Sequence, residues 1–293
     1  MKTLGLVGVR GYVGQELAEL VKAHGELDVR LAVSQRDGRS PADVASEKLD
    51  AYALMLPNGA STPYVEAITA ARTDAIIVDL SADHRFDAAW VYGQPERKRS
   101  EIRGATRIAN PGCYATAVQL ALAPLVPLLD GPASAFGVSG YSGAGTTPSP
   151  RNDPEQLRDQ IVPYSLVGHV HEREVSSQLG TQVFFVPHVA PFFRGITVTL
   201  SGALREPSSR GALVARYHEA YGSEPLVALE EEVPSVRAIV GKHHVAIGGV
   251  SVSADARHVV VVATIDNLLG GAASQALRNL NLALGFEERR GLS

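Results

Sequence analysis

The sequence predicts an α/β fold, with a Rossmann-type doubly wound parallel sheet and a second, α+β domain built on a mixed, largely antiparallel sheet. Three observations predict it. Short apolar runs alternate with segments of helical spacing over the first eighty residues, which is typical of βαβ units. A glycine-punctuated turn follows the first run. Beyond residue 113, the apolar runs have the pattern of half-buried strands in an antiparallel sheet.

In the first half of the chain, apolar runs alternate with helical spacing. They predict strands at 4–8, 29–34, 53–57 and 75–80, and helices at 15–23 and 62–71. Leu17, Leu20 and Val21, for example, share one face of the first helix. A further helix is predicted to begin at Cys113.

The second half is predicted to be richer in strands. They are expected at 136–145, where the run enters a Gly/Ser loop, and at 183–186, 195–202, 245–253 and 258–265, with helices at 208–221 and 271–284. We place a domain boundary at Cys113. Residues 1–112, completed by the C-terminal helix within 267–293, form the Rossmann domain, and residues 113–266 form a catalytic and dimerisation domain.

Composition excludes several classes of protein. With 293 residues, 45% hydrophobic side chains and a net charge of −4, the chain suits a globular protein and gives no reason to expect nucleic acid or a membrane as a partner. Its single cysteine excludes an internal disulfide and a cysteine-based metal site. The first apolar run is too short for a signal peptide, and no run could span a bilayer. A reducing cytoplasm is therefore expected.

The turn at Gly8, Gly11 and Gly14 is a candidate dinucleotide site. Glycines there let the backbone approach a pyrophosphate, and the following helix offers free N–H groups. Arg10, Tyr12 and Val13 lie in the same turn. The spacing is G-x-x-G-x-x-G rather than G-x-G-x-x-G, so a tight turn without a ligand is the alternative.

The end of the second strand favours NADP over NAD. It lacks the strand-end acid that usually binds ribose hydroxyls, and it carries Ser34, Arg36 and Arg39, which suit a 2′-phosphate. Asp37 could instead serve a ribose, and a solvated loop with surface arginines is the other alternative.

Cys113 is a candidate nucleophile. It follows Asn-Pro-Gly and begins a helix, and a helix N-terminus stabilises a thiolate and so lowers the thiol pKa. An inert buried cysteine is the default alternative, but the placement behind a nucleotide-binding unit favours catalysis.

A thiolate nucleophile needs an acid–base partner, and the chain has nine histidines. His169 and His171 stand at the start of a predicted helix, and they could also be a metal pair, although no third ligand is clear and no metal is expected. The other candidates are His188, His243 and His244, whereas His24, His218 and His258 suit a solvated surface.

An anionic substrate requires a cation. Arg194 lies among apolar residues that would hold it in place, although it could simply pair with a local carboxylate. The loop from Gly140 to Gly145 could approach a ligand through its backbone. Asp79 and Asp83 follow a strand at the edge where α/β sites gather, or else cap a helix.

These motifs together resemble the N-acetyl-gamma-glutamyl-phosphate reductases, within the aspartate-semialdehyde dehydrogenase superfamily. The resemblance runs nearly from end to end. Its motifs are the glycine turn at 8–14, Leu-Pro-Asn-Gly at 56–59, Asp-Leu-Ser-Ala-Asp-His-Arg-Phe at 79–86, Asn-Pro-Gly-Cys-Tyr-Ala-Thr at 110–116, Ser-Gly-Tyr-Ser-Gly-Ala-Gly at 139–145, His-Val-His-Glu-Arg-Glu-Val at 169–175, Pro-His-Val-Ala-Pro-Phe-Phe-Arg-Gly-Ile at 187–196 and Asp-Asn-Leu-Leu-Gly-Gly-Ala-Ala-Ser-Gln at 266–275.

The resemblance implies NADPH-dependent reduction of N-acetyl-gamma-glutamyl phosphate to the semialdehyde and phosphate, through a cysteine thioester, in arginine biosynthesis. It implies Cys113 and His171 as catalytic residues and a homodimer or homotetramer. The other implied contacts are Asn110, Ser142, His169 and Arg194 for substrate, and Gly8, Arg10, Gly11, Tyr12, Val13, Gly14, Ser34, Arg36, Pro57, Asn58, Ser81, Gly143, Asn267 and Gly271 for the cofactor.

The alternatives are another acyl phosphate, such as aspartyl phosphate or a carrier-linked aminoadipyl or glutamyl phosphate, and a non-catalytic NADP-binding protein. The chain also departs from the family pattern. It has His169-Val-His171 where the family often has His-Arg-His, and Thr146 where an arginine often closes the glycine loop, with Arg151 as a possible replacement. Between Arg39 and Leu54 it lacks room for an additional strand.

Overall fold

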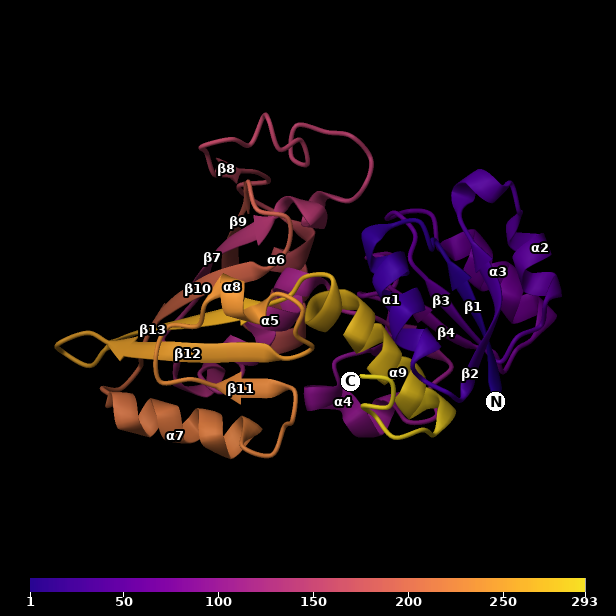
Figure 1. Ribbon diagram of the computed structural model, residues 1–293. Coiled ribbons are helices and arrows are strands. Elements are labelled where there is room, and N and C mark those ends of the chain that lie inside the picture. Colours follow the sequence, from indigo (N-terminus) through magenta and orange to yellow (C-terminus); the bar gives the residue numbers. More distant parts are fainter. Residues whose placement is uncertain (293) are drawn as a thin grey trace. The chain divides into compact units, whose positions relative to one another are not determined.

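The computed structural model describes residues 1–292, apart from the side chain of Gln35, and it contains two compact units (Figure 1). The first unit combines residues 1–112 with the segment that begins at Ala272. The second unit comprises Cys113–Gly271.

The first unit is built on a six-stranded sheet in which every neighbouring pair is parallel, with the order β2-β1-β3-β4-β6-β5. Its strands are β1 (Lys2–Val7), β2 (Leu27–Val33), β3 (Ala51–Leu54), β4 (Ile76–Asp79), β5 (Val91–Tyr92) and β6 (Arg107–Ala109). β3 and β4 are buried at every residue, as strands covered on both faces must be. The predicted parallel sheet is confirmed, with β5 and β6 added to it.

The strand order reverses between β1 and β3, which makes the carboxyl edge of these two strands the topological switch point of the sheet. The segment in which an additional strand would have fitted holds α2 (Pro41–Ser46) instead. Ser40 and Asp43 form a capping box at its start, with the Ser40 hydroxyl accepting the Asp43 N–H at 3.2 Å. The chain therefore passes from β2 through α2 to β3, which lies on the other side of β1, with no strand in between.

Helices cover the sheet of the first unit. They are α1 (Tyr12–Lys22), α3 (Thr62–Ala71), α4 (Pro95–Ile102) and α9 (Ser274–Leu284). α9 comes from the end of the chain and is buried from Ser274 to Leu282, because it packs against α1, α4 and β4. Arg278 on α9 lies between Glu96 of α4 and Glu288, at 2.6 Å from each. This buried triad fixes the C-terminal segment to the first unit.

The second unit is built on a seven-stranded mixed sheet with the order β11-β12-β13-β10-β7-β9-β8. Its strands are β7 (Ala133–Gly140), β8 (Val162–Pro163), β9 (Val183–Ala190), β10 (Ile196–Ala203), β11 (Val227–Leu229), β12 (Val245–Val252) and β13 (His258–Ile265). The pairs β7–β9 and β11–β12 are parallel and the other four are antiparallel, which confirms the predicted mixed sheet.

Four helices accompany this sheet: α5 (Cys113–Leu122), α6 (Val170–Leu179), α7 (Arg210–Tyr221) and α8 (Val236–Ile239). α5 is the central one, since it is buried from Tyr114 to Leu122 and packs against β10, β13 and α6. β7 and β9 alternate between buried and accessible residues, so they present Phe136 and Phe184 on an uncovered face, about half exposed.

Several predicted boundaries moved, for example the strand predicted at 53–57, which ends at Leu54, and for two of them the reason is identifiable. The strand predicted at 183–186 continues to Ala190 through Pro187, which is tolerated because only the two-residue β8 lies beyond β9 at this edge. The helix predicted from Gly271 begins at Ser274, because Leu269–Ala273 form a wider π-helical turn.

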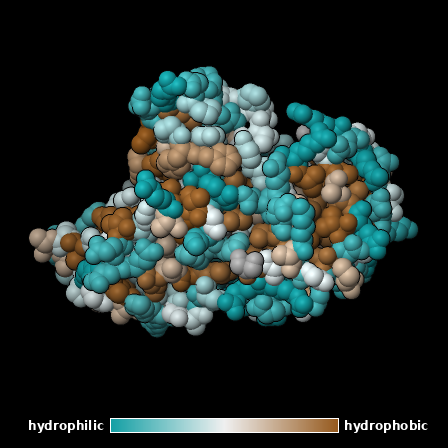
Figure 2. Space-filling view, viewed as in Figure 1, coloured by the Kyte–Doolittle hydropathy of each residue, from teal (hydrophilic) through white to brown (hydrophobic). Residues whose placement is uncertain are grey.

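Figure 2 shows hydrophilic side chains around separate hydrophobic patches on the visible face of each unit. Within residues 1–292, no helix is long and apolar enough to cross a membrane.

Candidate active site

The turn after β1 is shaped by two of its three glycines. Gly8 has φ +102°, and a Cβ there would lie 2.1 Å from the carbonyl oxygen of Met55. A Cβ on Gly14 would lie 2.4 Å from the Gly8 carbonyl oxygen. Gly11, in contrast, has ordinary extended backbone, and a Cβ there would meet nothing closer than the Gly8 carbonyl oxygen at 3.5 Å. This close-packed turn leads into α1, and Gly11 has no side chain with which to cap the helix, so its first N–H groups suit an anion.

At the end of β2, Ser34 and Asp37 bond to each other. The Asp37 carboxylate accepts the Ser34 N–H at 2.6 Å and the Ser34 hydroxyl at 2.9 Å. These two bonds, with the Arg10 guanidinium at 3.4 Å, lower the pKa of Asp37. Arg39 pairs with Glu47 at 2.9 Å, whereas Arg36 is exposed. The carboxylate that could have served a ribose is thus engaged locally, and cations surround it.

The loops after β3 and β4 are joined by their own polar side chains. The Asn58 carbonyl oxygen accepts the Ala82 N–H at 3.0 Å, and the buried Ser81 hydroxyl donates to Asp79 at 2.7 Å. Asp83 accepts the Gly59 N–H at 2.6 Å. Neither Asp79 nor Asp83 caps a helix, so that alternative was wrong. Pro57 and Asn58 remain exposed at this edge, whereas the Ser81 side chain does not.

The turn before Cys113 is held by buried polar contacts. Asn110 is 1% exposed, and its side-chain oxygen accepts a hydrogen bond from Asn279 of α9 at 2.9 Å. Its backbone carbonyl accepts from the Arg85 guanidinium at 2.9 Å, and its N–H donates to the Asp79 carbonyl at 2.8 Å. Sequence reasoning did not assign Arg85 a role. The structure gives it one, which is to hold the backbone that leads into Cys113.

Cys113 is half-buried at the first position of α5. A Cβ on Gly271 would lie 2.7 Å from the Cys113 Cβ and 3.1 Å from its Cα, so only glycine fits beside the thiol. The π-helical turn that contains Gly271 is what presents this glycine. Gly271, predicted as a cofactor contact, therefore packs directly against the cysteine.

His169 and His171 belong to an aromatic cluster around the start of α6. Their ring centroids lie 4.8 Å apart, and the His171 ring lies 5.9 Å from Tyr114. Tyr164 lies 5.7 Å from His169. Burial, reinforced by the negative charge that Cys113 carries when it is ionised, raises the pKa of Tyr164 to about 12. Since α6 packs on α5 and Tyr114 directly follows Cys113, the cluster connects both histidines to the cysteine helix.

Arg194 is engaged by a carboxylate. Its Nε lies 2.8 Å from one oxygen of Asp266, and its Nη2 donates to the other at 2.9 Å. Asp266 is fully buried and also accepts backbone N–H groups of Gly241 and Leu268, at 2.7 and 2.9 Å. Arg194 thus pairs with a carboxylate, as in the alternative weighed from sequence, but the partner lies 72 positions away and is not a local one. The pair fixes the guanidinium in one orientation.

Asn267 joins the glycine loop to the turn after Arg194. Its side-chain oxygen accepts the Gly195 N–H at 2.7 Å, and its amide donates to the Ser142 hydroxyl at 2.9 Å. Both Asn267 and Ser142 are buried, whereas Gly143 is exposed. The loop that contains Ser142 and Gly143 is thus positioned by Asn267.

The remaining histidines are dispersed. The His188 ring packs at a tilt against Phe136, with the ring centroids 4.1 Å apart, and partial burial lowers the pKa of His244. His24 was expected at a solvated surface, which was wrong, because it is 3% exposed and bonds to Asn281 of α9 at 2.8 Å. His258 is exposed. Within residues 1–292, no three His, Cys, Asp or Glu side chains gather as metal ligands would.

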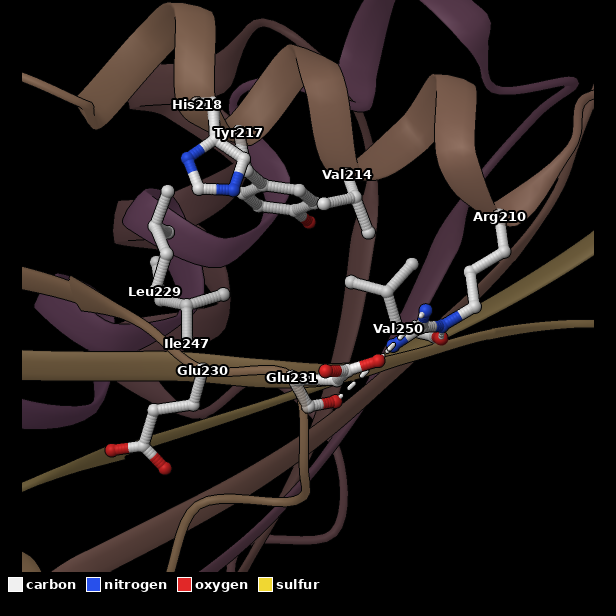
Figure 3. A pocket seen from close by; sticks show the side chains of 9 residues that line it. All are labelled: Arg210, Val214, Tyr217, His218, Leu229, Glu230, Glu231, Ile247 and Val250. Carbon is white, nitrogen blue, oxygen red and sulfur yellow. Dashed lines mark hydrogen bonds and ion pairs between the residues drawn. The ribbon is translucent and has the colours of Figure 1, made fainter.

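His218 lines a pocket of about 380 Å³ (Figure 3). The pocket lies between α7 and the strands β11 and β12, and its other lining residues include Arg210, Tyr217 and Glu231. None of the predicted site residues lines it. In Figure 3, the Arg210 side chain extends from α7 to Glu231, and the two charged groups lie 3.7 Å apart.

Two family models match nearly the whole chain. Residues 3–105 match the semialdehyde dehydrogenase NAD-binding domain, and residues 113–267 match the semialdehyde dehydrogenase dimerisation domain. An N-acetyl-gamma-glutamyl-phosphate reductase from Xanthomonas euvesicatoria is 50% identical over 98% of this chain and 97% of its own length. The chain belongs to the N-acetyl-gamma-glutamyl-phosphate reductase family.

The chain is also similar to a longer protein and to solved structures of the same fold. Protein arg-6, mitochondrial, from Neurospora crassa is 48% identical over 99% of this chain, which matches 36% of that longer protein. Aspartate semialdehyde dehydrogenase II from Vibrio cholerae has the same fold, with a TM-score of 0.78 and 16% identity, over 97% of this chain and 99% of that one. The structure of an aspartate semialdehyde dehydrogenase with NADP from Candida albicans matches with a TM-score of 0.72 and 15% identity. The match covers 97% of this chain and 98% of that one.

Proposed function

We propose that this reductase converts N-acetyl-gamma-glutamyl phosphate to N-acetylglutamate semialdehyde and phosphate, with NADPH as reductant, in arginine biosynthesis. The observation that carries the proposal is the placement of Cys113. It is the first residue of a buried helix, beside a glycine that leaves it room and an aromatic cluster that holds His171. Family membership supports the substrate, and the arg-6 relative supports the pathway.

NADP fits the residues at the carboxyl edge of the first sheet. Gly8 and Gly14 are packed too closely for side chains, which gives the tight turn and the close approach of α1 that a pyrophosphate-binding turn requires. Gly11, Tyr12 and Val13 would offer N–H groups to the pyrophosphate. Arg10 and Arg36 would bind the 2′-phosphate, with the ribose near Ser34, while Pro57, Asn58 and the Ser81 backbone would line the edge. When bound, this cofactor supplies a hydride.

The chain's own residues would carry the rest of the reaction. The Cys113 thiolate, favoured by the N-terminus of α5, attacks the acyl carbon, and phosphate leaves with the electrons of the broken C–O bond. The resulting thioester accepts the hydride at its carbonyl carbon. Collapse of the thiohemiacetal breaks the C–S bond, which frees the aldehyde and returns the electron pair to Cys113. His171 would hold and move the proton at the sulfur and at the carbonyl oxygen.

Positioned polar groups would bind the substrate. Arg194, oriented by Asp266, would bind the phosphate or the α-carboxylate. Asn267 and Gly271, which support the Ser142 loop and the cysteine, would also face the nicotinamide, with Gly143. Asn110 would act chiefly through the turn that it holds, since its side chain is already bonded to Asn279.

We also propose a cytoplasmic location and a homodimer or homotetramer. The chain has a single, partly accessible cysteine, which suits a reducing compartment. The family model for residues 113–267 is described as a dimerisation domain, and the uncovered face of β7 and β9 exposes Phe136 and Phe184. Sedimentation of the intact protein would measure the oligomeric state.

The test is the reverse reaction, with semialdehyde, phosphate and NADP, on wild type and Cys113→Ser. N-acetylglutamate semialdehyde is expected to be turned over far faster than aspartate semialdehyde or an aminoadipate semialdehyde. Cys113→Ser should lose at least about a thousandfold in kcat while NADPH still binds. If another semialdehyde is preferred, the proposed substrate is wrong. If Cys113→Ser keeps its activity, the proposed thioester on Cys113 is excluded.

A further inference from the structure

His169 caps the helix that carries His171. Its backbone has φ −57° and ψ 142°, and its ring Nδ1 accepts the N–H of His171 at 3.1 Å. Helix caps are usually Ser, Thr, Asn or Asp, so an imidazole in this position is uncommon. To accept this bond, Nδ1 must be unprotonated, which places the proton of the neutral ring on Nε2.

The first turn of α6 is held at a second point. Glu172 accepts the Gly168 N–H at 3.1 Å and the Phe185 N–H of β9 at 2.9 Å. The Phe185 ring lies 5.5 Å from His169 and 6.4 Å from His171, so both imidazoles pack on one side chain. Once the cap is in place, the backbone of His171 is fixed by His169 and its ring by Phe185 and Tyr114.

The surroundings of His169 favour the capping form. Its ring is partly buried and lies near Arg151, and both effects lower its pKa, while Glu172 opposes them. Arg151 in turn sits over the Tyr164 ring, with its Cζ 4.9 Å from the centroid. The groups around His169 are therefore Arg151, Tyr164, His171 and Glu172, with Phe185 as the apolar neighbour.

We propose that His169 is a positioning residue whose unprotonated Nδ1 caps α6 at the N–H of His171 and so holds the His171 imidazole for proton transfer at Cys113. This inference rests on the proposed role of His171. It differs from the interpretation of His169 as a substrate contact, because the ring acts through the helix. The geometry requires an acceptor at this position and no charge.

Three variants separate these roles in the reverse assay. His169→Asn keeps a side-chain acceptor that can cap the helix, and His169→Ala removes it. His169→Ala is expected to lower kcat by roughly ten- to a hundredfold with little change in KM, since misplacement by about 1 Å costs about that much. His169→Asn should stay within about threefold of wild type. His171→Ala tests the proposed function by itself.

The pH profile gives the second readout. Protonation of His169 removes the acceptor, so wild-type kcat should fall on the acid side as the ring becomes charged. In His169→Asn, which cannot be protonated, that acid limb should be lost or move to lower pH.

An equal loss in His169→Asn and His169→Ala, with raised KM, would overturn the inference in favour of a substrate contact. Full activity of His169→Ala would overturn it as well. Full activity of His171→Ala would instead contradict the proposed function. Circular dichroism and thermal melting of each variant identify any that is unfolded, and His169→Asn then decides the question.

Discussion

The two candidate sites are built in different ways. At the nucleotide edge of the first unit, polar side chains such as Asn58, Ser81 and Asn110 bond to other groups of the same unit, and the glycine turn presents backbone instead. In the second unit, the reactive side chains Cys113 and His171 stand at the starts of two packed helices. Backbone N–H groups are suited to binding the phosphates of a cofactor, whereas the making and breaking of covalent bonds requires titratable side chains.

The largest effect is expected where the first unit depends on backbone. Gly8→Ala would force φ +102° on a residue with a Cβ, 2.1 Å from the Met55 carbonyl oxygen. It should cost about 4 kcal/mol in the free energy of unfolding and abolish NADPH binding. Gly11→Ala in the same turn is the matched control, expected within about 1 kcal/mol. Urea unfolding, followed by the fluorescence of the single tryptophan, Trp90, measures the stability of both variants. Equal effects would show that the turn is not set by close packing.

The second unit should be most sensitive at its buried ion pair. Arg194→Met leaves the fully buried Asp266 without its cation, which should cost about 3 kcal/mol in unfolding free energy and lower turnover. Lys22→Met, which removes an exposed pair with Glu19, should change stability by less than about 0.5 kcal/mol. Chemical denaturation compares them. If Arg194→Met left the stability unchanged, the backbone donors to Asp266 would be sufficient to stabilise its buried carboxylate.

A smaller effect is expected at Arg151. Its guanidinium lies over the Tyr164 ring and near His169. Arg151→Ala should raise KM for the acyl phosphate about fivefold, as expected for an accessible cation, with little change in kcat. Arg158→Ala, in the same loop, is the control. If the KM of Arg151→Ala were unchanged, Arg194 would remain the only cation proposed to bind the substrate.

The smallest effect is a pH dependence in the first unit. Burial lowers the pKa of His24, so the folded state favours its neutral form. Stability is then fully present above the unfolded pKa of about 6.5 and is lost as pH falls below it towards the folded pKa. His24→Gln should flatten this loss between about pH 5 and 7, followed through Trp90. An unchanged slope would assign the acid sensitivity to other groups.

The fold could be predicted because local patterns determine it. Apolar runs gave the buried strands, and the Asn-Pro-Gly turn placed the start of α5 at Cys113. The polar helix α4 was missed because Pro-Glu-Arg-Lys-Arg-Ser-Glu-Ile has little apolar periodicity, and α2 because it is only six residues long. β5 and β6 were missed because they are only two and three residues long.

The site residues could be nominated from sequence, but their contacts could not. Asp266 lies 72 positions from Arg194, and Asn279 lies 169 from Asn110, so no local pattern pairs them. The cap by His169 had a signal, since it directly precedes a predicted helix. That signal was overlooked because caps are expected to be hydroxyl, amide or carboxylate side chains.

The central claim, that Cys113 carries the acyl group, is tested most directly by trapping it. Wild-type protein is incubated with N-acetylglutamate semialdehyde and NADP but without phosphate, and then analysed by intact-mass and peptide mass spectrometry. We expect about one NADPH per chain and an N-acetylglutamyl group on the peptide that contains Cys113, released when phosphate is added. NADPH formation with an unmodified Cys113, or with the acyl group on another residue, would contradict the account.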